Sequence, residues 1–206
     1  MKAEERKQLI LDCSKRLFST YGYYRTQISD ITEEAQIARG TIYQYFKNKQ
    51  DIFITLLENA YQQWEISILK DISAVDLKTI TPINYLRLRI RTTVAFLVAD
   101  PDIFNIAMTM GFGLPTELAE ATRRLEEKII IIAYNDFKLG MHNNHIKENL
   151  NVTHVGEMMV GAIFSSVYFA LLKANKDARK INTESLADEI VDLFAPGIFR
   201  TEALNL

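Results

Sequence analysis

The chain has 206 residues, of which 48% are hydrophobic and 24% are charged, and its formal net charge is −2. This balance is typical of a globular protein and excludes a disordered or fibrous one. The longest uncharged stretch, residues 158–172, is shorter than the roughly 20 apolar residues that cross a bilayer. The charged N-terminus also lacks the apolar core of a signal peptide. We therefore expect a cytoplasmic protein with no membrane partner.

The single cysteine, Cys13, excludes an internal disulfide framework and a zinc site built from several cysteines. It lies on an apolar helical stripe, so we interpret it as a small core residue. Charge is distributed unevenly along the chain. Residues 1–50 carry nine Lys and Arg against six Asp and Glu, whereas the remaining residues carry 15 against 20. A basic end on an acidic body favours an anionic partner for the first segment.

The first fifty residues predict three short helices. The apolar residues of 3–20 fall on one face, and Gly22 follows as a C-terminal stop. Helices over 27–35 and 38–45 come next, each too short to be stable alone. A tight turn between these two helices is typical of a helix-turn-helix unit.

The apolar positions of this unit predict which side chains face outward. Ile28, Ile31 and Ala35 would form the inner face of one helix, and Ile42 and Phe46 would anchor the next. The outward residues would then be Arg39, Gly40, Thr41, Tyr43 and Tyr45. A major groove about 12 Å wide admits a helix, and Arg and Thr can reach base edges. An alternative is that the two tyrosines belong to an aromatic core cluster.

Helical periodicity continues to the C-terminus without strand alternation or internal repeats, so the fold class is all-α. Asn48 can cap a long helix over 49–70. Further helices are expected at 82–99 behind Thr81-Pro82, from 101 behind Asp100, at 116–139 after the breakers Gly111, Gly113 and Pro115, at 152–175 after a polar loop over 142–151, and at 182–194 before Pro196-Gly197.

The segment Leu17 to Phe53 resembles the tetracycline-repressor (TetR) family of transcriptional regulators. The matching features are a Leu-Phe pair, an aromatic turn with glycine, and the run Gly-Thr-Ile-Tyr-Gln-Tyr-Phe-Lys-Asn-Lys at residues 40–49. The resemblance covers about the first 55 residues. It implies an N-terminal three-helix DNA-binding domain over 1-48 and a larger helical effector-binding and dimerisation domain over 49-206.

The resemblance also implies roles for individual residues. DNA would be faced by Thr26, Gln27 and Ser29, bases would be read by Arg39 and Thr41 beside the small Gly40, and phosphates would be held by Tyr43, Tyr45 and Lys49. Three positions depart from the family pattern: Thr32, Gln36 and Ala38. Gln36 in a left-handed turn costs about 1 kcal/mol relative to Gly, and Ala38 cannot supply a capping side chain.

A repressor reads a palindrome with two recognition helices about 34–36 Å apart, so we expect a homodimer. Helix 152–175 is apolar on more than one side and carries small residues, and helix 182–194 would accompany it in a four-helix interface, as the family resemblance also implies. The alternative is that helix 152–175 is the centre of a monomeric bundle.

Aromatic and methionine residues in the middle of the chain suit the lining of an effector cavity. The candidates, each of which could equally be core, are Tyr61, Trp64, Phe96, Phe104, Met108, Phe112, Phe164 and Tyr168. Arg87, Arg89 and Arg91 would suit an anionic ligand such as an acyl-coenzyme or a fatty acid, but a solvated helix surface explains them as well. The His142 and His145 pair lacks a third ligand in register, so we expect no metal and no cofactor.

These features predict a DNA-binding transcriptional regulator. In particular, they predict a repressor that binds double-stranded operator DNA and leaves it when a small, largely apolar effector binds. The long helix 49–70 would transmit the effector's signal. The sequence contains no phosphate-binding loop, nucleophile elbow or HExxH motif, so we do not expect an enzyme. The alternative is a helical small-molecule or lipid-binding protein without DNA function, which would leave the Arg39–Lys49 pattern unexplained.

Overall fold

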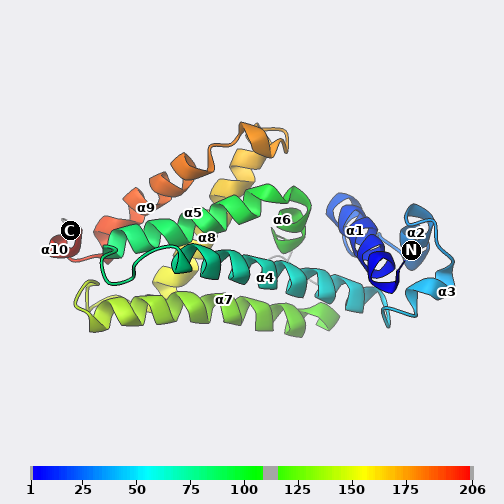
Figure 1. The fold of residues 1–206 in the computed structure, drawn as a ribbon, viewed down its shortest axis with the longest axis horizontal. Helices are drawn as coiled ribbons and strands as arrows, with labels where there is room; N and C mark the ends of the chain where they lie inside the picture. The colour runs from blue at the N-terminus through cyan, green and yellow to red at the C-terminus, as the bar shows by residue number, and fades with distance from the viewer. Residues whose placement is uncertain (1, 109–115, 205–206) are drawn as a thin grey trace. The chain divides into compact units, whose positions relative to one another are not determined.

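The computed structural model describes residues 2–108 and 116–204, and these residues form helices with no strand among them (Figure 1). The predicted all-α class is confirmed. The chain divides into two compact units, Met1–Gln62 with Asp102–Leu125 and Gln63–Pro101 with Glu126–Leu206. This division differs from the predicted boundary at residue 48 because the first turns of the long helix pack in the core of the first unit. The predicted breakers Gly111 and Gly113 lie outside the described residues.

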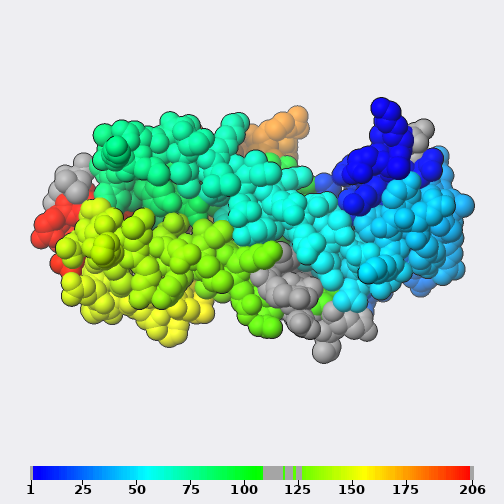
Figure 2. Space-filling model, turned by 60° about the horizontal axis from the view of Figure 1, so that its bottom comes forward, coloured from blue at the N-terminus to red at the C-terminus, as the bar shows by residue number. Residues whose placement is uncertain are grey.

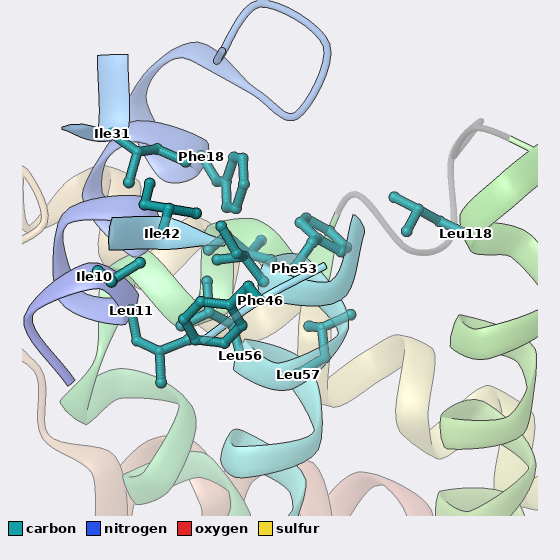
Figure 3. Packing of buried hydrophobic residues seen from close by; sticks show 12 residues of the cluster. Ile10, Leu11, Phe18, Ile31, Ile42, Phe46, Phe53, Leu56, Leu57 and Leu118 are labelled. Atoms are coloured by element: carbon teal, nitrogen blue, oxygen red, sulfur yellow. The ribbon is translucent and has the colours of Figure 1, made fainter. Parts of the chain in front are cut away.

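The first unit is built around one continuous apolar core. Its helices are α1 (Ala3–Tyr21), α2 (Ile28–Glu34), α3 (Arg39–Ile42), the first part of α4 (Lys49–Ser73), α6 (Pro101–Met108) and the start of α7 (Thr116–His142). Phe18 of α1 meets Phe53 of α4 edge to face, with ring centroids 5.5 Å apart. Figure 3 shows Phe18, Ile31 and Ile42 converging in this core. Burial of these large side chains contributes most of the stability of the unit.

Turn chemistry in the first unit follows the sequence closely. Gly22 ends α1 with φ +82°, and its N–H donates to the carbonyl of Phe18 at 3.0 Å. Gln36 has φ +52°, so the predicted left-handed residue of the α2–α3 turn is confirmed. Ala38 is the N-cap of α3 and provides no side-chain hydrogen bond. Asn48 accepts from the Asp51 N–H at 2.8 Å, which confirms the predicted cap of α4.

In the second unit, α5 packs along α9 and also contacts α8. The helices are the rest of α4, α5 (Pro82–Ala99), the rest of α7, α8 (Val152–Lys173), the short η2 (Ala178–Lys180), α9 (Thr183–Ile198) and α10 (Thr201–Leu204). The predicted starts are confirmed: Thr81 accepts from the Asn84 N–H at 3.3 Å, and Asn182 accepts from the Ser185 N–H at 3.1 Å. Figure 2 shows α7, in yellow-green, along the surface of this unit.

The predicted end of the last helix before Pro196-Gly197 is wrong, because α9 continues to Ile198. Proline removes one helical N–H donor and its ring crowds the carbonyl four residues earlier, but N–H groups that follow it can still donate. The Phe199 N–H still donates to Ala195 at 2.9 Å, and the ammonium of Lys147 binds the Pro196 carbonyl at 2.7 Å. The polar loop after α7 is thereby held against the end of α9, where Ile146 and Phe199 form an isolated bridge.

Helix α8 has one buried and one exposed face. Its buried residues are Val152, Val155, Gly156, Met159, Ile163, Val167 and Leu171. Met158, Phe169 and Leu172 are more than half exposed on the other side. By length and composition α8 could cross a membrane, with a mean hydropathy of 1.7 over its most apolar window, but core helices of soluble proteins have the same character.

Candidate nucleic-acid interface

Helix α3 turns one side inward and presents the opposite side to solvent. Ile42 is fully buried against Ile31 of α2, whereas Arg39 and Gly40 are exposed and Thr41 is half-buried. In Figure 2 the light-blue segment around α2 and α3 forms an outer surface of the first unit. The predicted outward placement of Arg39 and Gly40 is therefore confirmed, while Thr41 lies at the edge of the exposed side.

The second helix of the helix-turn-helix unit is shorter than the predicted helix over residues 38–45. Only Arg39–Ile42 is α-helical, because the next bonds span three residues: Gln44 N–H to Thr41 at 3.2 Å and Tyr45 N–H to Ile42 at 2.9 Å. Bonds of this span tighten the last turn, so the side chains that follow Ile42 point in other directions than they would on an α-helix. Tyr43 is half exposed, whereas Tyr45 packs partly against the core. The packing alternative therefore describes Tyr45 better than Tyr43.

The start of α2 combines two exposed residues with one buried residue. Gln27 and Ser29 are exposed, and the Gln27 N–H donates to Asp30 at 2.7 Å. Thr26 is 1% exposed, and its hydroxyl lies 2.9 Å from the carbonyl of Gly22 and 3.3 Å from that of Leu17. The prediction that the Thr26 side chain faces DNA is therefore wrong. A short hydroxyl beside a glycine turn satisfies backbone carbonyls instead.

Lys49 also differs from its predicted role. Its ammonium donates to the carbonyls of Tyr23 at 2.7 Å and Thr26 at 2.8 Å, and it lies 4.2 Å from the centroid of the Tyr23 ring. The side chain is half-buried rather than exposed. Two of its three donors thus serve the turn between α1 and α2.

Sequence reasoning missed two exposed residues of that turn, Tyr24 and Arg25. Tyr24 is 69% exposed beside the buried Thr26. Only the glycine stop before them indicated that they lie at a bend. A surface hollow of about 530 Å³ is lined by Leu17, Tyr21, Arg25, Asp30, Glu33, Glu34 and Gln36. Its three carboxylates repel phosphate, so this hollow is unsuited to DNA.

Cys13 is 1% exposed in the core of the first unit, and burial raises the pKa of its thiol. It therefore stays a neutral thiol near pH 7, which confirms the predicted core role.

Comparison with known proteins agrees with this geometry. The model of the family described as bacterial regulatory proteins, tetR family, matches residues 10–56, which span α1 to the first turns of α4. The fatty acid metabolism regulator protein of Bacillus subtilis is 28% identical over 192 residues, covering 92% of this chain and 93% of the relative. The HTH-type transcriptional regulator HbdR of Aromatoleum is 40% identical over 72 residues, covering 35% of this chain and 31% of HbdR.

Residues 10–56 therefore carry the DNA-binding domain of the TetR family of transcriptional regulators.

Solved structures show the same fold along nearly the whole chain. The FadR regulator of Bacillus subtilis, solved in complex with stearoyl-CoA, has a TM-score of 0.75 and 26% identity, covering 93% of this chain and 98% of that one. The FadR structure from Bacillus halodurans has a TM-score of 0.77 and 21% identity, covering 96% of this chain and 98% of that one. The second helical unit therefore also has the architecture of these regulators.

The predicted effector residues do not gather within one unit. Tyr61, Phe104 and Met108 belong to the first unit and Trp64, Phe96, Phe164 and Tyr168 to the second, while Phe112 lies outside the described residues. Phe104 is fully buried, and Trp64 donates to the hydroxyl of Thr93 at 3.1 Å. Tyr168 is 42% exposed on the outer face of α8, so it does not line an interior cavity of its unit.

The three arginines of α5 are paired with carboxylates. Arg91 lies 2.6 Å from Asp188 of α9, and Arg87 lies 2.8 Å from Asp192 and 3.2 Å from Asp188. An anionic ligand at these arginines would have to displace an aspartate, so they serve first to join α5 to α9. Among the described residues no group of three potential metal ligands gathers, and His142 with His145 remains a pair.

On the opposite side of α5, Arg89 lies 3.1 Å from Asp136 of α7, and the Tyr85 hydroxyl donates to the same carboxylate at 3.2 Å. Burial raises the pKa of Asp136, and the nearby Arg89 guanidinium opposes that rise. The pKa of Tyr85 is also raised, first by burial and then by the Asp136 charge. These three side chains, Tyr85, Arg89 and Asp136, therefore form a partly desolvated polar link within the second unit.

Proposed function

We propose that this regulator is a cytoplasmic repressor that binds a palindromic operator as a homodimer and is released by a small, largely apolar effector. The observation that carries the proposal is the two-sided α3, with Ile42 buried and Arg39 and Gly40 exposed. A rigid element with an apolar underside and an arginine on its outer side can enter a major groove and bind base edges.

Arg39 and Thr41 are the proposed base-reading residues. Gln27 and Ser29 at the start of α2, together with Tyr43, are proposed to contact the DNA backbone, since hydroxyl and amide side chains donate to phosphate oxygens. Gly40 allows close approach because a Cβ there would meet no atom of the protein itself, so its space is available to DNA.

The exposed faces of α8 and α9 support the dimer. Met158, Gly161, Ser165, Phe169 and Leu172 follow one another at helical spacing along the exposed side of α8. On α9, Leu193 is 77% exposed, and α9 packs directly against α8. Apolar side chains and small residues at this spacing favour close helix packing with a second copy. A twofold axis through such a four-helix contact would present two α3 segments to one face of DNA.

The relative solved with stearoyl-CoA supports an effector with a long apolar chain. If such a molecule fits only a conformer in which the two α3 segments are wrongly spaced, it lowers DNA affinity by its differential affinity for the two conformers. The single helix α4 begins in the first unit and ends in the second. A tilt of α4 is therefore the proposed route from effector to DNA.

DNA recognition is tested by selecting binding sequences from a randomised duplex library and measuring the affinity of the enriched duplex over a salt series. A repressor should enrich a palindrome, with log affinity falling linearly with log salt at a slope of about −0.9 per phosphate contact. Arg39→Ala and Thr41→Ala should each reduce discrimination between sequences by about 1–3 kcal/mol. Arg179→Ala, which removes an exposed arginine from the second unit, is the matched control and should leave selectivity unchanged. No enrichment and no salt dependence would favour the helical lipid-binding alternative.

Release is tested by adding stearoyl-CoA, or stearate alone, to the complex with the enriched duplex. An effector should lower DNA affinity, and the duplex should lower effector affinity by the same factor, because coupling between two binding sites is reciprocal. Binding of stearoyl-CoA with no change in DNA affinity would contradict the proposed release.

A further inference from the structure

Lys49 joins two parts of the first unit that are distant in sequence. It is the first residue of α4, and both of its carbonyl acceptors, on Tyr23 and Thr26, belong to the turn between α1 and α2. The ammonium also lies over the Tyr23 ring at 4.2 Å. A cation that donates to two carbonyls and contacts an aromatic face makes three favourable contacts with one short segment.

The turn that Lys49 holds is itself packed against the core. The Tyr23 ring contacts Phe53 at 5.2 Å between centroids and Phe18 at 5.8 Å. Thr26 is buried, with its hydroxyl bound to the carbonyls of Gly22 and Leu17. The backbone of residues 23–26 is therefore fixed on one side by α1 and on the other by the start of α4.

This position matters for the DNA interface because α2 begins two residues after Thr26. The exposed Gln27 and Ser29 follow directly from the carbonyl that Lys49 binds. We propose that Lys49 is a positioning residue that ties the start of α2 to the first residue of α4, and that it does not hold a DNA phosphate. The proposal rests on the DNA contacts proposed above, and it implies that the start of α2 follows any movement of α4.

The salt dependence of binding separates the two roles of Lys49. A residue that holds a phosphate contributes about 0.9 to the slope of log affinity against log salt. A positioning residue lowers affinity at every salt concentration and leaves the slope unchanged. The test variant is Lys49→Met, which keeps the side-chain length and removes the charge and the donors. The matched control is Lys47→Met, which removes an exposed lysine two residues earlier.

We expect Lys49→Met to lower affinity for the enriched duplex about tenfold with an unchanged slope, because two charge-assisted hydrogen bonds that orient α2 are lost. Its melting midpoint should fall by about 3–8 °C, and amide hydrogen exchange across residues 23–34 should accelerate. Lys47→Met should change neither melting nor amide exchange. Lys49→Arg, which keeps the charge and donors, should recover most of the melting midpoint.

A slope reduced by about one unit, with unchanged melting and amide exchange in Lys49→Met, would overturn the proposal and restore Lys49 as a phosphate ligand. If Lys49→Met does not fold, Lys49→Gln, which keeps an N–H donor without charge, provides the same slope comparison. Melting and amide exchange are measured without DNA. Failure of the wild-type chain to bind any duplex would therefore contradict the proposed function. Melting and amide exchange would still test whether Lys49 joins the start of α2 to α4.

Discussion

Each of the two units has its own buried apolar core, but they differ in their polar contacts and in the apolar surface that they leave exposed. In the first unit, apolar side chains from α1, α2, α3, α4, α6 and α7 meet in one core, and hydrogen bonds from Lys49 join the start of α4 to the turn at residues 23–26. In the second unit, α5 is joined to its neighbours by arginine–aspartate pairs on two sides, while large apolar residues of α8 remain exposed. The first unit is thus complete within a single chain, whereas the second presents apolar surface that a second copy would cover.

The largest effect is expected in the core of the first unit. Phe53 is 1% exposed and packs edge to face on both Phe18 and Tyr23. Phe53→Ala should lower the free energy of unfolding by about 3–5 kcal/mol, because it removes buried apolar surface and leaves a cavity. Urea denaturation followed by circular dichroism measures the loss. Tyr24→Ala, which truncates a 69% exposed ring of the same unit, should cost under about 0.5 kcal/mol. Equal losses would mean that the core does not extend to Phe53.

The next effect tests the proposed second copy. Leu172 is 57% exposed on the outer face of α8, and Leu172→Arg would bring two like charges into a twofold contact. Light scattering should show monomers, and operator affinity should fall about 100-fold, or roughly 2.7 kcal/mol. The control Leu69→Arg introduces the same change at a 60% exposed position of α4 and should leave the oligomer intact. If both variants stay dimeric, the contact lies elsewhere.

A smaller effect is expected at the partly buried pair of the second unit. Asp136→Ala removes the acceptor of both Arg89 and Tyr85 and leaves a guanidinium side chain that is only 13% exposed without its counter-charge. The free energy of unfolding should fall by about 1–3 kcal/mol. Adding Arg89→Met to Asp136→Ala should recover part of the loss, since the uncompensated charge is then absent. Additive losses would show that the two side chains act independently.

Much of the fold could be predicted because its signals are local. Gln36 in the left-handed region, the cap by Asn48 and the starts at Thr81 and Asn182 depend only on residues within a few positions. The outward side of α3 was also predictable, because the apolar position at Ile42 fixes the opposite side. Pro196 misled because the sequence marks a breaker without showing which bonds survive around it.

The errors at Lys49 and at the α5 arginines come from contact between distant segments, whereas the Thr26 hydroxyl binds carbonyls only four and nine positions before it. Thr26 and Lys49 are polar residues at helix starts, where exposure is the ordinary expectation. The Lys49 ammonium binds the carbonyl of Thr26, which is 23 positions away, and that of Tyr23, which is 26 positions away. Arg91 pairs with Asp188 across 97 positions. Local patterns do not specify such pairs. Whether a lysine binds phosphate or its own backbone depends on packing that only the structure shows.

The smallest effect compares two of the aspartates that α5 binds, Asp188 and Asp136, through the sign of the pH dependence of stability. The Arg91 guanidinium, through its hydrogen bonds, lowers the pKa of Asp188. A carboxyl whose pKa is lower in the folded state stabilises the fold above its unfolded pKa of about 3.9, and this contribution is lost as the pH falls through the folded value. Asp188 is partly exposed, so solvent screening limits the cost of Asp188→Ala at pH 7 to about 0.2–1 kcal/mol.

Burial raises the pKa of Asp136, so there the folded state gains stability relative to the unfolded state as the pH falls. Denaturation at pH 7 and at acid pH should therefore show the gap between wild type and Asp188→Ala closing, while the gap for Asp136→Ala widens. If the two differences in unfolding free energy change in the same direction with pH, the opposite pKa shifts of Asp188 and Asp136 are contradicted. Burial would then not decide the direction of the shift, because Asp188 is solvated and Asp136 is desolvated.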